Sequence, residues 1–247
     1  MTKILLLDIE TSPNLAHVWG IWQQNVGLNQ LLESSKTLCF AAKWLGKDEV
    51  IFNSSYNTSH KKMLKEIHKM IDEADAVIHY NGTKFDIPTL NKEFLLAGMS
   101  PPSPVKQIDL LQVAKKQFRF VSNKLDYVSQ ALGLGKKTSH MGHELWVKCM
   151  NKDPEAWKLM EEYNRNDVIL LERVYYKFLP WIKHHVNMNH FNDETVCPNC
   201  GSNHYQKRGF ALTTVSKFQR YQCQGCGNWF RSNKNLSKGK ENVVNVI

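Results

Sequence analysis

Acidic residues stand at three places in this 247-residue sequence where a carboxylate could take part in chemistry. Asp8 and Glu10 alternate around one apolar residue at the end of the strand-like run "KILLLDIE", so their side chains share one face of a sheet. Asp86 follows a second strand-like segment and a glycine turn in "HYNGTKFDIP". Asp167 comes four residues after Tyr163, which places the two about 40° apart on one helix face.

Each group also has an ordinary structural explanation. The first two acids could lie beyond the sheet in solvent, Asp86 could cap a helix, and the last pair could be a solvated helix face. Four carboxylates that meet at the carboxyl end of a sheet would repel one another, and divalent cations that prefer oxygen ligands relieve such repulsion. Two such ions about 3.5–4 Å apart stabilise the attacking and leaving oxygens of a phosphoryl displacement.

The segments "DIE", "NGTKFD" and "YNRND" resemble the three exonuclease motifs of the DEDD superfamily of 3′–5′ exonucleases, which have a ribonuclease H-like fold. The middle motif, Asn-x3-Phe-Asp, and the last, Tyr-x3-Asp, are similar to the proofreading domains of family B DNA polymerases. The resemblance covers about residues 1–186 and extends to stand-alone predicted exonucleases of bacteria and their phages. It includes "LCFAAKWLG" and "SNKLDYVSQALGLGKK".

The resemblance implies that two Mg²⁺ or Mn²⁺ ions are held by Asp8, Glu10, Asp86 and Asp167. It gives Tyr163 the role of orienting the attacking water, since a phenol with an ordinary pKa near 10 is a poor base at neutral pH. Another branch of the superfamily has a histidine five residues before the last acid, where this chain has Glu162. The sequence therefore resembles the tyrosine branch.

Other residues of these motifs are candidates for substrate contact. The resemblance implies that Thr11, Asn81 and Phe85 shape the site around the terminal nucleotide. His140 and His143 lie too far upstream of the last acid for the histidine pattern, and we interpret them as loop or helix-start residues. We expect Asp109, in "QIDLL", to be a helix N-cap.

Four of the six cysteines form two Cys-x2-Cys pairs, Cys197 with Cys200 and Cys223 with Cys226. Two such pairs supply four thiolates to one structural Zn²⁺, which stabilises a module too small to have a large core. An iron–sulfur cluster is the alternative. Cys39 and Cys149 stand alone in apolar segments and are expected to be buried thiols.

Basic and aromatic residues are interleaved around these cysteines. Residues 191–247 carry 8 Lys and Arg against 3 Asp and Glu, within a chain of formal net charge +9. Lys207, Arg208 and Arg220 are the candidates for contact with phosphates, while neighbouring aromatic rings could stack on bases or form the core of the module.

The rest of the sequence must position these groups. "KILLLDIE", "HVWGIW", "TLCFAAKWL" and "EVIFNSS" are typical of strands and predict an early β-meander, and "AVIHYNG" predicts a further strand. "SHKKMLKEIHKMIDEA" has apolar residues at helical spacing. Helical segments dominate from Asp86 onward, and the longest runs from Pro154 to about Phe178, ended by Pro180.

Strands followed by alternating strands and helices predict an α/β fold, with a ribonuclease H-like mixed sheet flanked by helices and a small C-terminal zinc ribbon of four cysteines. We expect a nuclease domain at residues 1–186, a linker at 187–195, the zinc ribbon at 196–233 and a flexible basic tail at 234–247. Acids directly after the first apolar run argue against a signal peptide, and no apolar run approaches the roughly 18 residues of a membrane helix. We expect a cytoplasmic protein of a bacterium or of a phage-infected cell, without a membrane partner.

The leading functional hypothesis is a metal-dependent 3′–5′ exonuclease that hydrolyses phosphodiester bonds at the 3′ ends of single-stranded DNA, with two Mg²⁺ or Mn²⁺ ions and one Zn²⁺. Its partner is a nucleic acid, DNA in preference to RNA, and replication or recombination proteins are further candidates. An exoribonuclease of the same fold is one alternative. A noncatalytic adaptor that recruits partners through the ribbon is the other.

Overall fold

The computed structural model describes residues 2–237, 241, 243 and 244. Part of the predicted basic tail (234–247) therefore lies outside the described residues. The chain separates into two compact units, one of residues 3–175 and one formed mainly by residues 176–247. Among the described helices, none combines the length and the hydrophobicity required to cross a bilayer.

A mixed five-stranded sheet forms the centre of the first unit, in the order β5-β4-β1-β6-β7. Its strands are β1 (Ile4–Thr11), β4 (Thr37–Trp44), β5 (Ile51–Ser54), β6 (Ala76–His79) and β7 (Lys106–Asp109). β4 runs antiparallel to both β1 and β5, whereas β6 and β7 continue the sheet parallel to β1. β1 is thus an interior strand, which explains its uninterrupted apolar run "ILLL".

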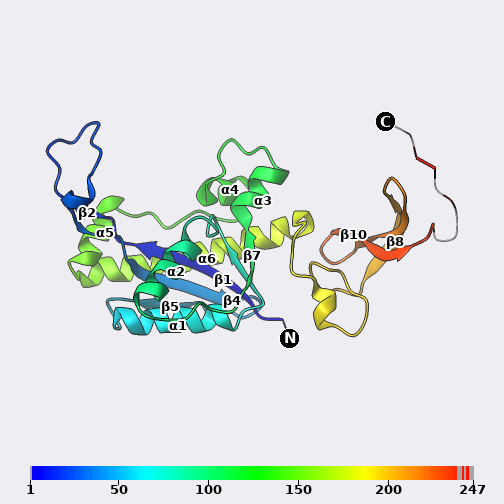
Figure 1. Ribbon diagram of the computed structural model, residues 1–247, viewed down its shortest axis with the longest axis horizontal. Coiled ribbons are helices and arrows are strands. Elements are labelled where there is room, and N and C mark those ends of the chain that lie inside the picture. Colours follow the sequence, from blue (N-terminus) through cyan, green and yellow to red (C-terminus); the bar gives the residue numbers. More distant parts are fainter. Residues whose placement is uncertain (1, 238–240, 242, 245–247) are drawn as a thin grey trace. The chain divides into compact units, whose positions relative to one another are not determined.

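Helices follow the strands as the alternating pattern predicts (Figure 1). They are α1 (His60–Asp72), α2 (Asp86–Leu96), α3 (Leu110–Gln117), α4 (Leu125–Ala131), α5 (His143–Met150) and α6 (Pro154–Phe178). α6 ends where Pro180 enters a short 3-10 turn, Leu179–Trp181, because proline lacks the N–H that would continue the helix. Asp109 caps α3, as expected, by accepting hydrogen bonds from the backbone N–H groups of Leu111 and Gln112.

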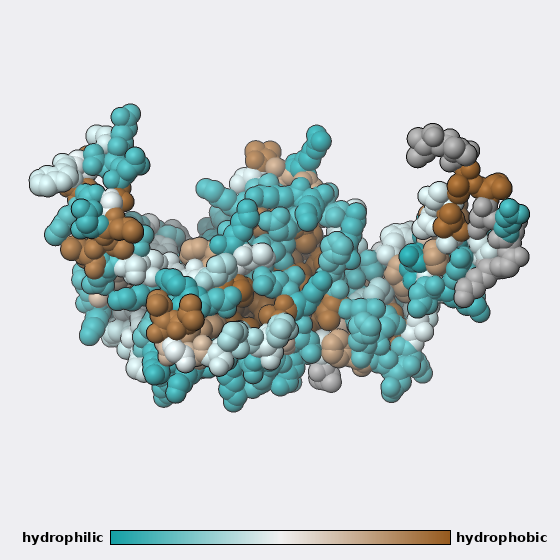
Figure 2. Space-filling model, viewed as in Figure 1, coloured by the Kyte–Doolittle hydropathy of each residue, from teal (hydrophilic) through white to brown (hydrophobic). Residues whose placement is uncertain are grey.

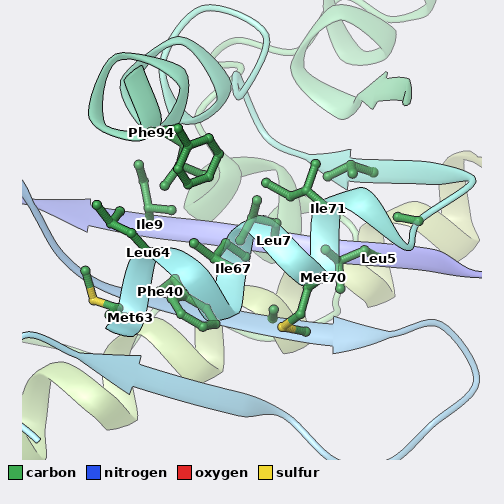
Figure 3. Close-up of a cluster of buried hydrophobic side chains, with 14 residues drawn as sticks. Leu5, Leu7, Ile9, Phe40, Met63, Leu64, Ile67, Met70, Ile71 and Phe94 are labelled. Atoms are coloured by element: carbon green, nitrogen blue, oxygen red, sulfur yellow. The ribbon is translucent and has the colours of Figure 1, made fainter. Parts of the chain in front are cut away.

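The two faces of β1 have different neighbours. Leu5, Leu7 and Ile9 point into a hydrophobic core with Phe40 of β4 and the apolar side of α1 (Figure 3). The alternate positions of β1, which include Asp8 and Glu10, face α5 and α6 instead. The period of two along the strand therefore delivers apolar residues to one layer and carboxylates to the other.

α6 is held against this second face by contacts along its length. Ala156, Trp157, Met160 and Tyr163 pack with α5, and the buried residues Val168, Leu171 and Val174 continue the apolar stripe. Glu172 of α6 also forms a partly buried ion pair with Lys43 of β4. These contacts fix the helix that carries Tyr163 and Asp167.

One predicted strand is wrong. In the "HVWGIW" segment, the chain leaves β2 (Leu15–Ala16) as an irregular loop and returns through a short 3-10 helix (Leu28–Gln30) to β3 (Leu31–Glu33). Aromatic and β-branched residues favour strands because they pack on a sheet surface, but Trp19, Ile21 and Trp22 are exposed to solvent. The predicted β-meander is otherwise present in β1, β4 and β5.

The second unit contains a three-stranded antiparallel sheet in the order β10-β9-β8. Its strands are β8 (Tyr205–Leu212), β9 (Lys217–Cys223) and β10 (Trp229–Asn235), and a 3-10 helix (Met188–Phe191) precedes them. The hairpin β8–β9 connects the two cysteine pairs, and β9 ends at Cys223. The predicted fold class, a mixed α/β sheet plus a small C-terminal sheet with four cysteines, is confirmed.

Candidate active site

Three carboxylates meet where β1 faces α6. One oxygen each of Asp8, Glu10 and Asp167 lies within 4.8 Å of the others. Asp8 and Glu10 share a face of β1, as the sequence predicts, and Asp167 reaches them from the middle of α6. Residues separated by more than 150 positions in the sequence thus form one acidic group, which we call the acidic triad.

Two neutral side chains fix the carboxylates of β1. Asn164 is fully buried on α6 and donates a hydrogen bond from Nδ2 to Oδ2 of Asp8 at 2.6 Å. The indole N–H of Trp146, on α5, donates to Glu10. Neither residue was found from the sequence. Asn164 lies within the "YNRND" segment. Its position next to Tyr163 is the one feature of the sequence that could have marked it as a residue of the site.

Asp86 lies beside the acidic triad at the first position of α2. β6 pairs with β1 only as far as Leu6, so the N–H of Ile9 has no strand partner on that side. Oδ1 of Asp86 accepts this N–H at 3.2 Å and is buried next to β1. Its oxygens are not among those that lie within 4.8 Å of one another, and it contributes to the site as a fourth, more distant acid.

Lys137 is a basic residue of the site that sequence reasoning missed. Its Nζ lies 2.6 Å from Oδ2 of Asp167 and 3.1 Å from the hydroxyl of Tyr163. Burial, the largest single influence, would lower the pKa of Lys137, but the neighbouring charges, Asp167 first, and the hydrogen bond to Asp167 together raise it, so the ammonium stays charged. The two glycines of "GLGKK" that precede Lys137 both have positive φ, but the sequence does not show which residues this turn approaches.

Tyr163 is held in an aromatic cluster and remains protonated. Its ring contacts those of His140 and Trp146 edge to face, at centroid distances of 4.8 and 6.0 Å. Burial and the nearby charge of Asp167 raise the pKa of its hydroxyl well above the ordinary value. His140 lies in a loop and His143 begins α5, as expected, yet the contact of His140 with Tyr163 was not foreseen. Tyr163 can therefore donate a hydrogen bond but is unsuited to act as a base.

The pKa values of all four carboxyl groups at the site are raised. Burial raises the pKa of Asp8 and Glu10, the charge of Asp167 raises both further, and that of Glu10 reaches about 8. Burial also raises the pKa of Asp86, to about 7, and that of Asp167. In the described part of the chain, Oδ1 of Asp167 is buried without a hydrogen-bond partner. Hard, buried, mutually repelling oxygen ligands of this kind fit a divalent cation.

A groove of about 620 Å³ opens beside Asp8. Three lysines line it, Lys115, Lys124 and Lys137, together with Tyr80 and Asn81. Cationic side chains along a groove are suited to the phosphates of a nucleic acid. The predicted residue Asn81 thus lies next to the acidic triad.

The residues predicted to shape the site around the terminal nucleotide are Asn81, Thr11 and Phe85. Asn81 has a φ of 71° and is held by its N–H, which donates to Asp109 Oδ1 at 2.9 Å. Thr11 is the last residue of β1, immediately after Glu10. Phe85 precedes α2 and has an exposed fraction of 44%, so its ring is available to a ligand.

The four cysteines of the second unit also converge. Their sulfur atoms lie within 4.8 Å of one another, with Sγ–Sγ distances of 3.7 Å for Cys197 and Cys226 and 3.6 Å for Cys200 and Cys223. Four thiolates in such a group fit one Zn²⁺. Cys39 and Cys149 are buried apart from this cluster, as expected.

The aromatic residues of the ribbon divide between its core and its surface. Tyr205, Tyr221 and Phe230 contact one another and form a small core. Trp229 is half exposed, with the guanidinium of Arg220 5.1 Å from its ring centroid. The remaining predicted contact residues, Lys207 and Arg208, are exposed on β8.

Comparison with known proteins matches the chain to one family profile and to many solved structures. A family profile described as the RNase_H superfamily matches residues 5–179. The structure of the family B DNA polymerase from the hyperthermophilic archaeon Pyrobaculum calidifontis is similar with a TM-score of 0.55, at 16% sequence identity over 73% of this chain. The chain spans only 25% of the length of that polymerase, and at this identity the likeness shows the fold alone. No curated protein gives a significant match.

The first prediction concerns the pH dependence of stability without metal. The folded acids hold their protons to a higher pH than the unfolded chain does, with Glu10 near 8 and Asp86 near 7. The folded state then binds more protons, so the free energy of unfolding must fall as the pH rises from about 4 to about 8. We expect a lower thermal midpoint at about pH 8.5 than at about pH 5.5, and a larger stabilisation by Mn²⁺ at the higher pH.

Asp8→Asn removes one repelling charge and should reduce this loss of stability, whereas Asp48→Asn, on an exposed loop, should leave it unchanged. Thermal unfolding of the three proteins in EDTA provides the comparison. A wild-type midpoint that rises over this pH interval, to the same extent in Asp8→Asn, would contradict the electrostatic account.

The second prediction concerns the cysteine cluster. Cys197→Ser removes one of four thiolates, and we expect zinc to be lost and the residues after about 191 to unfold, because metal binding supplies much of the folding energy of such modules. Elemental analysis measures the zinc, and limited proteolysis reports the unfolding. Cys149→Ala, outside the cluster, is the control that should retain zinc. Full zinc content in Cys197→Ser would refute the assignment.

Proposed function

This chain belongs to the RNase H superfamily, and we propose that it is a metal-dependent 3′–5′ exonuclease that hydrolyses phosphodiester bonds at the 3′ ends of single-stranded DNA. The convergence of the acidic triad with Tyr163 and Lys137 carries this proposal. Four acids, of which Asp86 and Asp167 are buried and Asp8 and Glu10 partly buried, repel one another strongly, and a protein that merely binds nucleic acid has no physical need for them. A noncatalytic adaptor is therefore the weaker explanation.

The direction of cleavage and the choice of DNA rest on the resemblance of the three motifs. Tyr163 stands four residues before Asp167, and Glu162 replaces the histidine of the other branch. This pattern is similar to the proofreading domains of family B DNA polymerases, and the fold of the Pyrobaculum calidifontis polymerase is similar as well. A DNA 3′ end is accordingly the proposed substrate.

Each residue of the site has a proposed part in the reaction. Asp8, Glu10 and Asp167 are the main ligands for Mg²⁺ or Mn²⁺, with Asp86 as the fourth. When bound, two such ions supply charge stabilisation to the attacking and leaving oxygens. Asn164 and Trp146 hold two of these carboxylates in place by hydrogen bonds.

Tyr163 and Lys137 act on the reactants. The protonated hydroxyl of Tyr163 donates a hydrogen bond that orients the attacking water. Lys137 places a permanent positive charge beside the same hydroxyl, where it can counter the negative charge that develops on the phosphate. Lys115 and Lys124 extend this positive charge along the groove and pair with phosphates of the strand.

The zinc ribbon is proposed as a second contact with the substrate. Lys207, Arg208 and Arg220 would pair with phosphates, while the half-exposed ring of Trp229 can stack on a base. The formal surplus of positive charge in residues 191–247 supports this assignment. We propose the cytoplasm as the place of action and replication or recombination proteins as partners.

The third prediction tests the activity. Purified protein is incubated with 5′-labelled and 3′-labelled DNA and RNA strands, in Mg²⁺, Mn²⁺ or EDTA. We expect a 5′-labelled DNA ladder that shortens from the 3′ end, is abolished by EDTA and by Asp8→Ala, and persists in Asp48→Ala. Degradation of RNA alone would identify an exoribonuclease. Absence of cleavage with either metal would eliminate the nuclease proposal.

The fourth prediction separates the role of Tyr163 from metal binding. Tyr163→Phe removes one hydrogen-bond donor, and we expect turnover to fall by about tenfold to a hundredfold, as for the loss of one hydrogen bond to a charged group. Mn²⁺ binding, measured by titration calorimetry, should be unchanged. Tyr127→Phe, on α4, is the matched control. Loss of Mn²⁺ binding in Tyr163→Phe would contradict the orienting role.

A further inference from the structure

The loop that replaces the predicted strand exposes an unusual concentration of large apolar side chains. We call residues 17–27 the tryptophan loop. Trp19 is 98% exposed, Ile21 83% and Trp22 81%. Figure 1 shows this loop projecting from the unit of residues 3–175, and Figure 2 shows hydrophobic residues on its surface. Exposed apolar side chains that cluster in this way mark a binding surface for a ligand, a membrane or another macromolecule.

The base of the tryptophan loop is firmly closed. The backbone N–H of His17 donates to the carbonyl of Gln30 at 2.9 Å, and the side chain of Gln30 donates back to the carbonyl of His17 at 2.9 Å. Oε1 of the same glutamine accepts the N–H of Gly27 at 2.8 Å. The loop is thus a closed, supported projection that holds its two indoles away from the core.

The tryptophan loop is connected directly to the acidic triad. β1 carries Asp8 and Glu10, ends at Thr11 and leads within four residues to β2, from which the loop starts. A groove of about 820 Å³ lies along its base and is lined by residues that include Lys36, His60 and Lys152. The groove is also lined by Ser12, Pro13, Asn14 and Leu15, the segment that joins the end of β1 to the start of the loop.

The amino-acid composition of the tryptophan loop indicates which kinds of ligand it can bind. Residues 13–32 contain no Lys, Arg, Asp or Glu, so the loop cannot recognise phosphates or a charged peptide through ion pairs. It offers two indole faces together with the amides of Gln23, Gln24 and Asn25. Flat aromatic faces stack on unpaired bases, and amides can hydrogen-bond with the edges of bases.

We propose that Trp19 and Trp22 stack on unpaired nucleobases of the strand whose 3′ end lies at the acidic triad. The inference rests on the proposed function for its substrate. It adds a binding site for bases, on a charge-free loop, to the sites for phosphates in the lysine groove and the ribbon. Such a site favours single strands over duplexes, because bases in a duplex are stacked on one another.

The fifth prediction tests this site by binding, without hydrolysis. Fluorescence anisotropy in EDTA measures the affinity of the full chain for a labelled oligothymidylate and for an abasic oligonucleotide of equal length and charge. We expect Trp19→Ala and Trp22→Ala each to weaken binding of the oligothymidylate about tenfold. Affinity for the abasic strand, and the salt dependence of binding, should not change.

A double variant of α2, Leu95→Ala with Leu96→Ala, is the matched control, because these leucines are 76% and 77% exposed on another element. It should bind both oligonucleotides as the wild type does. Wild-type affinity in both tryptophan variants would overturn the proposal. The loop would then be assigned to binding a protein or a lipid instead. An equal loss on both strands would also overturn it, since bases would then not be the ligand.

Failure of this proposal can be told apart from failure of the proposed function. Because the assay is carried out in EDTA, base stacking can be observed whether or not the protein cleaves DNA. A nuclease whose tryptophan variants bind normally refutes only the base site. A wild-type protein that binds neither oligonucleotide refutes the base site, and the cleavage assay with Mg²⁺ or Mn²⁺ then decides the nuclease proposal separately.

Discussion

Mutual repulsion among buried carboxylates is the constraint on which the rest of this structure depends. The oxygens of Asp8, Glu10 and Asp167 lie within 4.8 Å of one another, and burial makes each charge more costly than it would be in water. Such a group persists only if the surrounding fold is rigid enough to hold it. The interior strand β1 and the helix α6, fixed by an apolar stripe and by the Lys43–Glu172 ion pair, supply that rigidity.

The counter-charges provided by the protein itself are few. Lys137 pairs with one oxygen of Asp167 and leaves the other without a hydrogen-bond partner among the described residues. Asn164 and Trp146 orient Asp8 and Glu10 but bring no charge. The balance of charge within the site is therefore negative, which is the condition under which a divalent cation binds and a phosphodiester can then approach.

Local pattern was sufficient to predict much of this arrangement. The period of two along β1 placed Asp8 and Glu10 on one face, helical spacing joined Tyr163 to Asp167, and the cysteine pairs indicated their cluster. Lys137 and Trp146 could not be found in this way, since nothing in their neighbouring residues shows that they approach β1. The prediction of a strand for "HVWGIW" failed for the opposite reason. Its composition is typical of a strand, but its side chains have no sheet to pack on.

One crystallographic measurement tests the central claim most directly. Crystals soaked in Mn²⁺ are examined for anomalous scattering at the acidic triad. The account predicts a manganese peak bound by Asp8, Glu10 and Asp167, with Lys137 displaced from the oxygen of Asp167 that it contacts. An acidic triad without a manganese peak, with the Lys137–Asp167 pair intact, would contradict the claim that these carboxylates are arranged for a cation.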